Sequence, residues 1–564
     1  MVNLVLSALN AVTDLTKANF IKKTRRTAEV QERFLLRLLQ AHRDTEFGRK
    51  YQLGEIKTVD CFRKRVPILP YSSYEPYLER IANGKQNILT AESVVYLTLT
   101  SGSTGKKKMI PTTRRSQNIT RQATLTSMGF LTAALRSRGQ QFGKILLTNS
   151  TQQWGRTSAG IPYGPASAGV LSMDKWLYEQ FFAQPYETLQ VADSSARHYL
   201  ALLFALQDPL MRGVLANFPM LILRTCNYLE KFGEDLIQDI ETGTIANWLE
   251  VEPELRLTLE QRLSANLVRA NELREILQSE GKLTPHLAWS NLSFVACARG
   301  GTSDFYFERF PTYFGDTPIF GAVFSSAEGM FSIYHKLDDD SSILAIESGF
   351  FEFIPQDQWQ EEQPKTLLAT EVRSGERYRI LTTSYNGFYR YDIGDVIEVV
   401  GFYEQAPLIV FRHRQGGLIS STTEKTTEAH ATQVMQAVQQ EFSLLLEDFC
   451  ITLSENDFPA RYLINIELAN GYKLEDPQAF LNECDRKLQV ANTHYEISRK
   501  DPIPPPRLRI LAPGSFTILR QRQIERGVPD SQLKFPHISE DRNFLSGLQV
   551  QQEVKLPEDR DSEQ

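Results

Sequence analysis

Segments with helical and strand patterns alternate along most of this chain. Residues 29–43 carry apolar side chains at helical spacing, and we expect Gly48 to break this helix. The segment 87–100 is apolar and extended, and β-like runs follow in the sequences ILAIESGFFEFI, YRILTTSY, DVIEVVGFY and LIVFR. This alternation predicts an α/β fold. At 564 residues the chain also exceeds what one hydrophobic core usually supports, so two or more domains are expected.

A domain boundary is expected just after Arg414, where a glycine pair precedes a polar patch and a new helix. We therefore predict a large domain over residues 1–415 and a hinge over 416–423. A helix at 427–448, a strand at 461–468 and a helix at 477–492 predict a small α/β domain over 424–550. The charged last residues, 551–564, are expected to form a flexible tail.

Composition narrows the classes of function. A net charge of −6 gives no general attraction to nucleic acid, and no run of about 18 apolar residues predicts a membrane span. The N-terminal residues resemble an amphipathic helix rather than a signal peptide. The five cysteines show no CxxC spacing, and the eight histidines form no HExxH motif, so a reduced, cytoplasmic protein without a zinc site is expected. We expect a monomer.

The run TLTSGSTGKKKMIPTT, residues 98–113, combines hydroxyls, two glycines and three lysines. Small residues let backbone N–H groups approach phosphate oxygens, and a lysine adds a mobile positive charge. The run does not fit the GxxxxGK[ST] pattern of a Walker loop. Because it follows an extended apolar segment, we place it on a loop after a strand. A nucleotide-binding loop and a basic surface turn both remain possible readings of this run alone.

Two downstream segments add carboxylates and cations that a nucleotide needs. FGAVFSSAEGMFSI, residues 320–333, places Glu328 among hydroxyls and apolar residues, which suits a magnesium ligand. The segment 387–417 sets Asp395 beside a glycine and ends in arginines, which suits a ribose-binding carboxylate followed by a phosphate-binding Arg414. Alone, Asp395 could be a turn residue and Arg414 part of a surface ion pair. The order of the three segments favours one nucleotide site.

These segments resemble those of a known family. TSGSTGKKKMIPTT, FSSAEG and YRYDIGD, followed by GFYEQAPLIVFRHR, are similar to the three nucleotide motifs of the GH3 family of acyl acid amido synthetases. That family lies within the adenylate-forming superfamily, which includes luciferases and acyl-CoA synthetases. The resemblance extends to residues 44–90, to WSNLSFVACARGG and to GSFTILRQRQIERGVPDSQLKFPH, so it covers nearly the whole chain. It implies a large N-terminal adenylate-forming domain with β-sheets and a β-barrel-like subdomain, and a small mobile C-terminal α/β domain.

The resemblance also implies roles for particular residues. Those expected to bind ATP are Thr100, Ser101, Gly102, Ser103, Thr104, Gly105 and Lys108 around its phosphates, Phe324 against adenine and Asp395 at the ribose. Glu328 would hold Mg²⁺. Arg414 would contact phosphate or ribose, and Lys534, in the segment QLKFP, would reach the α-phosphate and the substrate carboxylate. Lys534 could also be a solvated loop lysine.

The implied reaction activates a carboxylic acid as acyl-AMP and passes the acyl group to the amine of an amino acid. The second motif departs from the family pattern YxSSE, because Phe324 replaces its tyrosine and Ala327 stands immediately before Glu328. A lost hydroxyl contact would cost on the order of 0.5 to 1.5 kcal/mol, which slows turnover without abolishing it. An acyl-CoA synthetase and a nucleotide-binding protein without catalysis remain alternatives. Residues 154–169 and a helix over 116–135 are candidate walls of a pocket for a hydrophobic acid.

Overall fold

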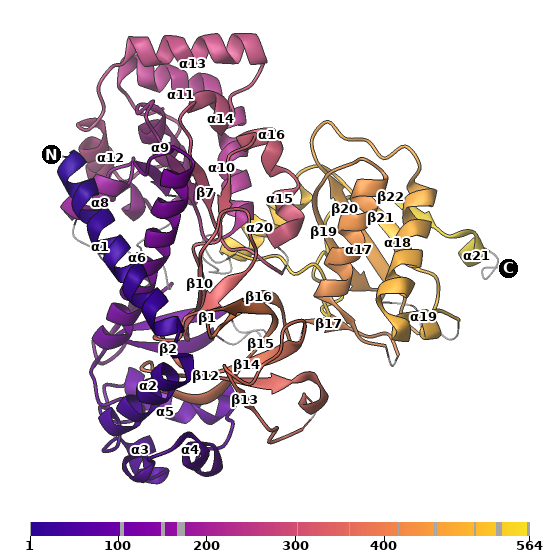
Figure 1. Cartoon of the computed structure of the whole chain (residues 1–564). Coiled ribbons are helices and arrows are strands. Elements are labelled where there is room, and N and C mark those ends of the chain that lie inside the picture. The colour runs from indigo at the N-terminus through magenta and orange to yellow at the C-terminus, as the bar shows by residue number, and fades with distance from the viewer. Residues whose placement is uncertain are drawn as a thin grey trace. The chain divides into compact units, whose positions relative to one another are not determined.

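The computed structural model describes residues 2–101, 107–147, 153–165, 175–301, 303–359, 361–415, 417–422, 424–455, 457, 459–500, 503–525 and 533–560. Contacts within the chain divide it into two compact units (Figure 1). The first unit contains Met1–Ser303 and Phe310–Phe411, and the second contains Asp304–Arg309 and Arg412–Gln564. The chain therefore leaves the first unit just before the predicted boundary, and a short internal segment belongs with the C-terminal residues.

The first unit begins with helices α1 (Val2–Thr24), α2 (Thr27–Ala41), α3 (Glu46–Lys50), α4 (Val59–Arg65) and α5 (Glu75–Ala82). The expectation that Gly48 breaks the first predicted helix is wrong, because α2 ends earlier and Gly48 lies inside α3. Thr45 begins α3 by accepting a hydrogen bond from the Gly48 N–H at 2.9 Å. A Cβ on Gly48 would lie 2.1 Å from the carbonyl oxygen of His42, so this close approach requires glycine.

The run at 98–113 forms a β-hairpin rather than an isolated turn. Strand β1 (Val94–Ser101) pairs antiparallel with β2 (Lys107–Thr113), and the loop between them lies outside the described residues. The prediction that a strand leads into this loop is confirmed. The sheet has the order β2-β1-β5-β4, with β4 at Gly155–Arg156 and β5 at Pro162–Gly164. Helix α6 (Arg114–Ser137) follows β2 directly, because Thr113 and Ser116 form a capping box.

A parallel sheet with the order β3-β6-β7-β8 forms a second layer of this unit. Its strands are β3 (Ile145–Leu147), β6 (Gly213–Leu215), β7 (Phe294–Ala296) and β8 (Ile319–Phe320). Parallel neighbours need long crossovers, and helices supply them here. These helices are α8 (Lys175–Phe181), α9 (Ser194–Leu206), α10 (Pro219–Lys231), α11 (Gly233–Thr242), α12 (Pro253–Glu260), α13 (Leu267–Glu280), α14 (Pro285–Ala288), α15 (Ser303–Phe307) and α16 (Phe310–Phe314).

The largest sheet is eight-stranded and carries the second and third motifs. Its order is β13-β12-β14-β15-β16-β11-β10-β9. Because β13 and β9 are its two edges among the described strands, the barrel-like subdomain expected from the sequence stays a prediction. The strands are β9 (Val323–Ser326), β10 (Gly329–Tyr334), β11 (Ser342–Leu344), β12 (Phe350–Pro355), β13 (Leu367–Leu368), β14 (Arg377–Ser384), β15 (Phe388–Tyr403) and β16 (Ala406–Arg414). The sequence runs noted above as β-like therefore form one sheet.

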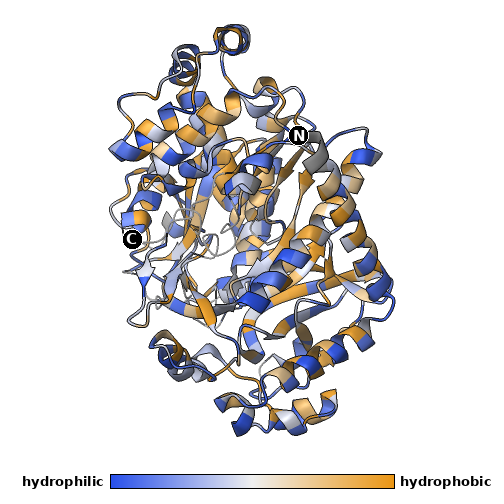
Figure 2. Ribbon diagram, turned by 90° about the vertical axis from the view of Figure 1, so that its left-hand side faces the viewer, coloured by the Kyte–Doolittle hydropathy of each residue, from blue (hydrophilic) through white to orange (hydrophobic). Residues whose placement is uncertain are grey.

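One hydrophobic core joins the N-terminal helices to this sheet. Leu35 and Leu38 of α2 are fully buried, and Phe351 and Phe353 of β12 are at most 1% exposed. Gln31 adds polar contacts between the same elements, because its amide nitrogen donates to the Ile346 and Gly349 carbonyls and its oxygen accepts from the Phe351 N–H. Figure 2 shows hydrophobic residues gathered on the strands and on the helix sides that face them.

The second unit is an α/β unit built on a sheet with the order β19-β20-β21-β22. Its strands are β19 (Leu446–Leu453), β20 (Tyr462–Leu468), β21 (Arg507–Leu511) and β22 (Val550–Lys555), and a separate ribbon pairs β17 (Leu418–Ile419) with β18 (Thr426–Thr427). Its helices are α17 (Glu428–Glu441), α18 (Pro477–Ala491), α19 (Thr493–Lys500), α20 (Ser515–Glu525) and α21 (Pro557–Arg560). The predicted hinge, 416–423, thus includes the short strand β17.

The prediction of a flexible tail over 551–564 is wrong for the part of it that the structure describes. Strand β22 pairs antiparallel with β21, and Val554 and Leu556 are buried. Asp559 is 1% exposed and accepts hydrogen bonds from Arg461 Nη1 at 2.7 Å and Arg507 Nε at 2.9 Å. The charged composition misled the sequence reading, because these charges are paired inside the fold rather than solvated.

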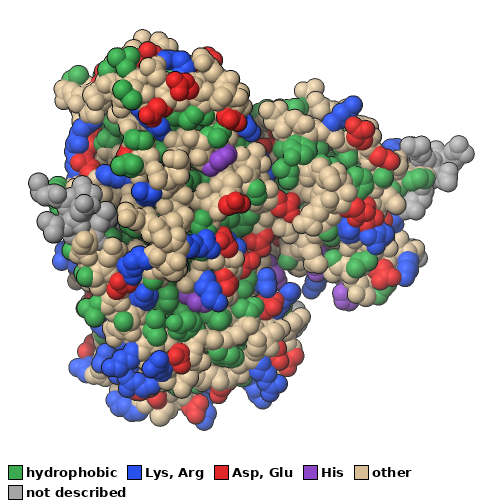
Figure 3. Space-filling model, turned by 45° about the horizontal axis from the view of Figure 1, so that its top comes forward, with side chains coloured by type: hydrophobic (Ala, Val, Ile, Leu, Met, Phe, Trp, Pro, Cys, Tyr) green, Lys and Arg blue, Asp and Glu red, His purple; other side chains and the backbone are tan. Residues whose placement is uncertain are grey.

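Charged side chains on the surface are mixed in sign. Figure 3 shows acidic and basic side chains interspersed over most of the face in view. No helix among the described residues is long and apolar enough to cross a membrane.

Candidate active site

The first motif lies at the turn of the β1–β2 hairpin. Thr100 pairs with Lys108, and Ser101 pairs with Lys107, at the ends of the two strands. The predicted phosphate-binding residues Gly102, Ser103, Thr104 and Gly105 lie outside the described residues. The ammonium group of Lys108 lies 5.1 Å from the centre of the Tyr71 ring, and this cation–π contact orients the lysine side chain.

Tyr71 connects the first motif to the second, and the sequence reading missed it. Its hydroxyl oxygen accepts a hydrogen bond from the Met109 N–H at 2.6 Å. Burial raises the pKa of Tyr71 to about 12, and the charges of Glu75 and Glu328 contribute to the rise. Lys108 therefore contacts this neutral phenol, and Glu328 lies near enough for its charge to act on it. The only signal in the sequence was the aromatic repeat YSSYEPY, which surrounds a short 3₁₀ turn at Tyr71–Ser73.

Glu328 occupies the two-residue turn of the β9–β10 hairpin, because Ser326 pairs directly with Gly329. Ser326 holds it there, since the Ser326 hydroxyl donates to Glu328 Oε2 at 2.7 Å and accepts from the Glu328 N–H at 3.2 Å. Glu328 is only 5% exposed. Ala327 is the other turn residue, so the hydroxyl that contacts the glutamate is supplied two residues before it rather than by its immediate neighbour.

Side chains of a second hairpin, β14–β15, donate hydrogen bonds to the backbone carbonyls of this turn. The Ser384 hydroxyl donates to the Glu328 carbonyl at 3.2 Å. The Asn386 amide donates to the carbonyls of Ala327 and Glu328 at 3.2 and 3.3 Å. Both residues lie where β14 turns into β15, the strand that carries the third motif. The β9–β10 and β14–β15 turns are therefore fixed against each other.

Phe324 precedes the glutamate on strand β9 and is half-buried. Its ring lies 5.1 Å from that of Phe331 and 5.2 Å from that of Phe411, centre to centre, in tilted contacts. Aromatic packing fixes this ring while part of its surface stays accessible. A planar ring held in this way can stack on a second planar group.

Asp395 follows a β-bulge in strand β15. Arg379 of β14 pairs with Val396, but Leu381 pairs with Asp392, so β15 carries extra residues between these two points. Gly394 lies in the bulge with a φ of 78°, a conformation that favours glycine. The bulge explains the glycine of the YRYDIGD segment, because it shifts Asp395 out of the regular ladder. Asp395 is 2% exposed.

Asp392 lies three residues before Asp395 and pairs with Arg379. Its carboxylate lies 2.8 Å from Arg379 Nε and accepts from the Gly394 N–H at 2.9 Å. Burial raises the pKa of Asp392, and the charge of Asp395 adds to this rise while Arg379 opposes it. The sequence reading assigned no role to Asp392, whose hydrogen bond shapes the bulge.

Arg390 anchors the start of the same strand and was also missed. Its guanidinium donates to Glu352 Oε2 at 2.9 Å and to Oε1 at 3.0 Å. It also donates to the carbonyls of Arg63 and Val66, both at 2.9 Å, and to the Thr366 hydroxyl at 3.3 Å. Every guanidinium N–H thus has a partner. Its φ of 47° is strained for a side chain with a Cβ, and these bonds hold it.

The remaining predicted residues belong to the second unit. Arg414 is exposed at the end of β16, and Lys534 is exposed on an extended segment. The neighbours of Lys534, Leu533 and Phe535, are 3% and 5% exposed, so they anchor the segment while the lysine faces outward. The structure therefore joins Lys108, Phe324, Glu328 and Asp395 through adjoining elements of one unit, and Arg414 and Lys534 are not part of that group.

The grouped residues offer one carboxylate suited to a metal rather than a metal cage. Among the described residues, no group of three or more His, Cys, Asp or Glu side chains is arranged to hold a metal ion. Glu328 presents one carboxylate at a hairpin turn, and its charge acts on Tyr71, which contacts Lys108 and Met109 of β2. A carboxylate, a cation and an aromatic surface in one place are the groups that a nucleotide with its metal ion requires.

Comparison with known proteins identifies the family of this chain. The GH3 family N-terminal domain matches residues 16–319, the GH3 family central domain matches 342–414, and the GH3 family C-terminal domain matches 429–543. The chain is 26% identical to indole-3-acetic acid-amido synthetase GH3.4 of Arabidopsis thaliana, over 94% of this chain and 92% of the relative. It is 25% identical to 4-substituted benzoates-glutamate ligase GH3.12 of the same plant, over 93% and 95%.

Solved structures agree on the fold. The acyl acid amido synthetase AtGH3.15 in complex with 2,4-DB matches with a TM-score of 0.85 at 22% identity, over 96% of this chain and 97% of that one. A 2-hydroxyisobutyryl-CoA ligase in its postadenylation state matches with a TM-score of 0.51 at 11% identity, over 94% and 90%. The predicted mixed α/β fold, with a large N-terminal and a smaller C-terminal part, is confirmed. With family domains matched in order from residue 16 to residue 543, this chain belongs to the GH3 family.

Proposed function

We propose that this chain is an ATP-dependent ligase that activates a carboxylic acid as acyl-AMP and joins it to the amine of an amino acid. The observation that carries this proposal is the convergence of Lys108, Phe324 and Glu328 with the Asp395 hairpin in one unit. The curated relatives cover most of the chain and are named as amido synthetases or as an acid–glutamate ligase, which supports amide formation.

The first half-reaction needs ATP because a carboxylate is a poor electrophile. A carboxylate oxygen forms a bond to the α-phosphorus, and the bond to the pyrophosphate oxygen breaks. We assign the hairpin loop from Thr100 to Gly105, with Lys108, to the β- and γ-phosphates. Asp395 would accept hydrogen bonds from the ribose hydroxyls, and Phe324 would stack on adenine. Arg414 and Lys534, on the second unit, would stabilise the charge that develops at phosphate and carboxylate.

Glu328 fits a magnesium ion that arrives with the nucleotide. One carboxylate oxygen accepts from Ser326, and among the described residues the other accepts no hydrogen bond. Mg²⁺ in nucleotide sites is commonly held by one or two protein carboxylates and by the substrate phosphates, so a single glutamate is sufficient. When bound, the ion neutralises charge on the phosphate oxygens. The contacts from Ser326, Ser384 and Asn386 would keep the glutamate oriented.

The second half-reaction forms the amide. The amine nitrogen attacks the acyl carbon, AMP leaves with the electron pair of the broken C–O bond, and the nitrogen loses a proton. We propose that the segment 416–423 is the hinge on which the C-terminal unit moves between the two steps. No covalent enzyme nucleophile is required.

The relatives suggest which substrates to test first. Their names include indole-3-acetic acid, 4-substituted benzoates and glutamate, so we propose an aromatic carboxylic acid and an amino acid as substrates. We also propose a cytoplasmic monomer. The five cysteines, all within the described residues, form no disulfide, which supports a reducing compartment.

The test is acid-dependent exchange of labelled pyrophosphate into ATP, measured across a panel of carboxylic acids. We expect exchange with at least one acid, and its loss in Glu328→Ala and in Asp395→Ala. The matched control is Lys107→Ala, a neighbouring lysine expected to change exchange very little. Equal losses in all three variants would contradict these roles, and no exchange with any acid would favour nucleotide binding without catalysis. Mass analysis with coenzyme A or amino acids as acceptors separates a thioester product from an amide.

A further inference from the structure

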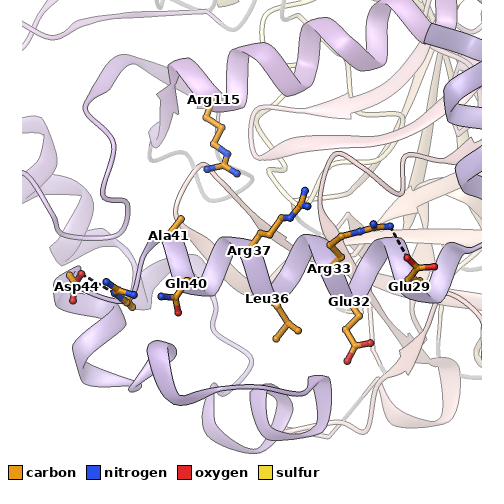
Figure 4. Close-up of a pocket in the computed structure, with 10 residues that line it drawn as sticks. Glu29, Glu32, Arg33, Leu36, Arg37, Gln40, Ala41, Asp44 and Arg115 are labelled. Atoms are coloured by element: carbon orange, nitrogen blue, oxygen red, sulfur yellow. Dashed lines mark hydrogen bonds and ion pairs between the residues drawn. The ribbon is translucent and has the colours of Figure 1, made fainter. Parts of the chain in front are cut away.

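A groove of about 830 Å³ lies beside helix α2, and none of the residues assigned to the nucleotide lines it (Figure 4). It runs along α2 and reaches the first turn of α6. Its lining combines charged side chains with a small apolar surface, and consists of Glu29, Glu32, Arg33, Leu36, Arg37, Gln40, Ala41, Arg43, Asp44 and Arg115. This volume is in the range of sites for small organic ligands.

The acidic side chains of the groove do not neutralise its centre. Glu29 pairs with Arg33 at 3.2 Å, and Asp44 pairs with Arg43 at 3.2 Å. Figure 4 shows Glu29 and Arg33 toward one end of the groove and Asp44 toward the other. With Glu32 included, four arginines line the groove against three acidic side chains, so its net charge is positive.

Arg37 and Arg115 supply that positive charge. Both point into the space between α2 and the start of α6 (Figure 4). Among the described residues, the Arg37 side chain forms no hydrogen bond or ion pair. The Arg115 guanidinium has a long ion pair, at 3.9 Å, with Glu92, whose carboxylate also accepts from the Arg115 backbone N–H at 3.3 Å, and both of these side chains are more than a third exposed. Two cations that share a groove repel each other unless an anion lies between them.

An aromatic platform orients Arg115. Its guanidinium carbon lies 3.8 Å from the centre of the Tyr385 ring, so the guanidinium is held by cation–π contact. Tyr385 in turn packs edge-on against Phe34 at 5.4 Å and His42 at 5.5 Å. Burial, with a smaller contribution from Arg115, lowers the pKa of His42 to about 4, so this histidine is neutral near pH 7. The platform is therefore rigid and uncharged.

We propose that this groove binds a small organic dianion, a phosphomonoester or a dicarboxylate, between Arg37 and Arg115. A guanidinium donates paired N–H bonds that match a carboxylate or phosphate group, and two of them suit a doubly charged group. The groove is much larger than one oxyanion, so an organic body has room against Leu36, Ala41 and the stem of Gln40. The site shares no lining residue with the proposed nucleotide site and does not depend on the proposed reaction.

Calorimetric titration of the whole protein at about 50 mM salt tests this proposal, with glycerol 3-phosphate, succinate and inorganic phosphate as probes. We expect at least one probe to saturate a single site. Arg37→Gln should weaken its binding tenfold or more, because that side chain has no folded-state partner to lose. Arg37→Lys keeps the charge without the paired donors and should weaken binding less. Stronger binding of glycerol 3-phosphate than of succinate would identify the phosphomonoester class, and the reverse order the dicarboxylate class.

A matched control separates a specific site from general electrostatics. Arg138→Gln removes the same charge just beyond the opposite end of the 24-residue helix α6, about 35 Å away, which is more than two Debye lengths at this salt concentration. It should change binding less than twofold. The proposal is overturned if none of the three probes binds at millimolar concentration, or if Arg37→Gln binds the probe as tightly as the unaltered protein, as it would if the anion occupied the nucleotide loop.

Discussion

Arg390→Met is expected to destabilise the protein strongly, because Arg390 links β15 to three other segments. The side chain is 5% exposed, and its bidentate partner Glu352 is 1% exposed. Methionine fills a similar volume but donates no hydrogen bond. The backbone strain at position 390 is the same for both side chains, so the change isolates the loss of the guanidinium contacts.

The structure sets the size of the effect. Breaking a buried ion pair by removing one partner costs about 3–5 kcal/mol. In Arg390→Met, the Glu352 carboxylate still accepts hydrogen bonds from Arg63 Nε at 3.2 Å and from the Thr366 hydroxyl at 2.6 Å. The cost of breaking its ion pair should therefore lie near the lower end of this range. The carbonyls of Arg63 and Val66 lose their donor as well, and buried acceptors without a partner cost about 1–3 kcal/mol each. We therefore expect a loss of at least about 3 kcal/mol.

Urea unfolding followed by circular dichroism, with calorimetry to separate the transitions of the two units, measures this loss. The control is Arg377→Gln on the neighbouring strand β14, whose ion pair with Glu398 spans 3.2 Å and whose side chain is 50% exposed. Exposed pairs contribute about 0–1 kcal/mol. Adding Glu352→Met to Arg390→Met should restore part of the stability, because the uncompensated charge is then gone. An Arg390→Met loss no larger than that of Arg377→Gln would refute the proposed anchoring role.

Three further results are expected. Burial lowers the pKa of His42 from 6.5 in the unfolded chain to about 4 in the folded protein, so the free energy of unfolding is highest above pH 6.5 and falls by about 3 kcal/mol as the pH drops toward 4. His42→Gln should flatten the dependence of this free energy on pH between these values, and an unchanged slope would exclude this histidine as its cause. Gly394→Ala should lower the free energy of unfolding by about 1 kcal/mol or more, because a φ of 78° is strained for alanine. It should also weaken ATP binding measured by calorimetry, and unchanged binding would mean that the bulge does not position Asp395 for the nucleotide. Asp559→Asn should lower the calorimetric melting temperature of the second unit, because Arg461 and Arg507 lose their shared buried anion and Arg461 keeps only the more exposed Asp457; an unaltered transition would mean that these ion pairs do not stabilise the unit.

Local sequence signals predicted the elements that depend on nearby residues. The apolar segment before the first motif predicted β1, because alternation and β-branched residues act over a few positions. The capping box at Thr113 and Ser116 begins α6 for an equally local reason. The family, the α/β fold and the grouping of Lys108, Phe324 and Glu328 could therefore be anticipated from motifs in order along the chain.

Contacts between distant parts of the chain could not be anticipated. Tyr71 contacts Met109, and Asn386 contacts the Glu328 turn, only because elements far apart in the sequence pack together. The Arg390–Glu352 pair also depends on strand register, which a bulge changes by shifting side chains between faces. The tail was misjudged for a related reason, because the charge of Asp559 has no visible partner until β22 joins the sheet.

The central claim is that this chain activates a carboxylate as acyl-AMP before forming an amide, and transfer of ¹⁸O from substrate to product tests it most directly. An aromatic acid labelled in both carboxylate oxygens is incubated with ATP, magnesium and glutamate, and the products are analysed by mass spectrometry. We predict one ¹⁸O in AMP and the other in the amide. Label in inorganic phosphate with ADP as the coproduct would contradict the account, as would an amide formed without label in AMP.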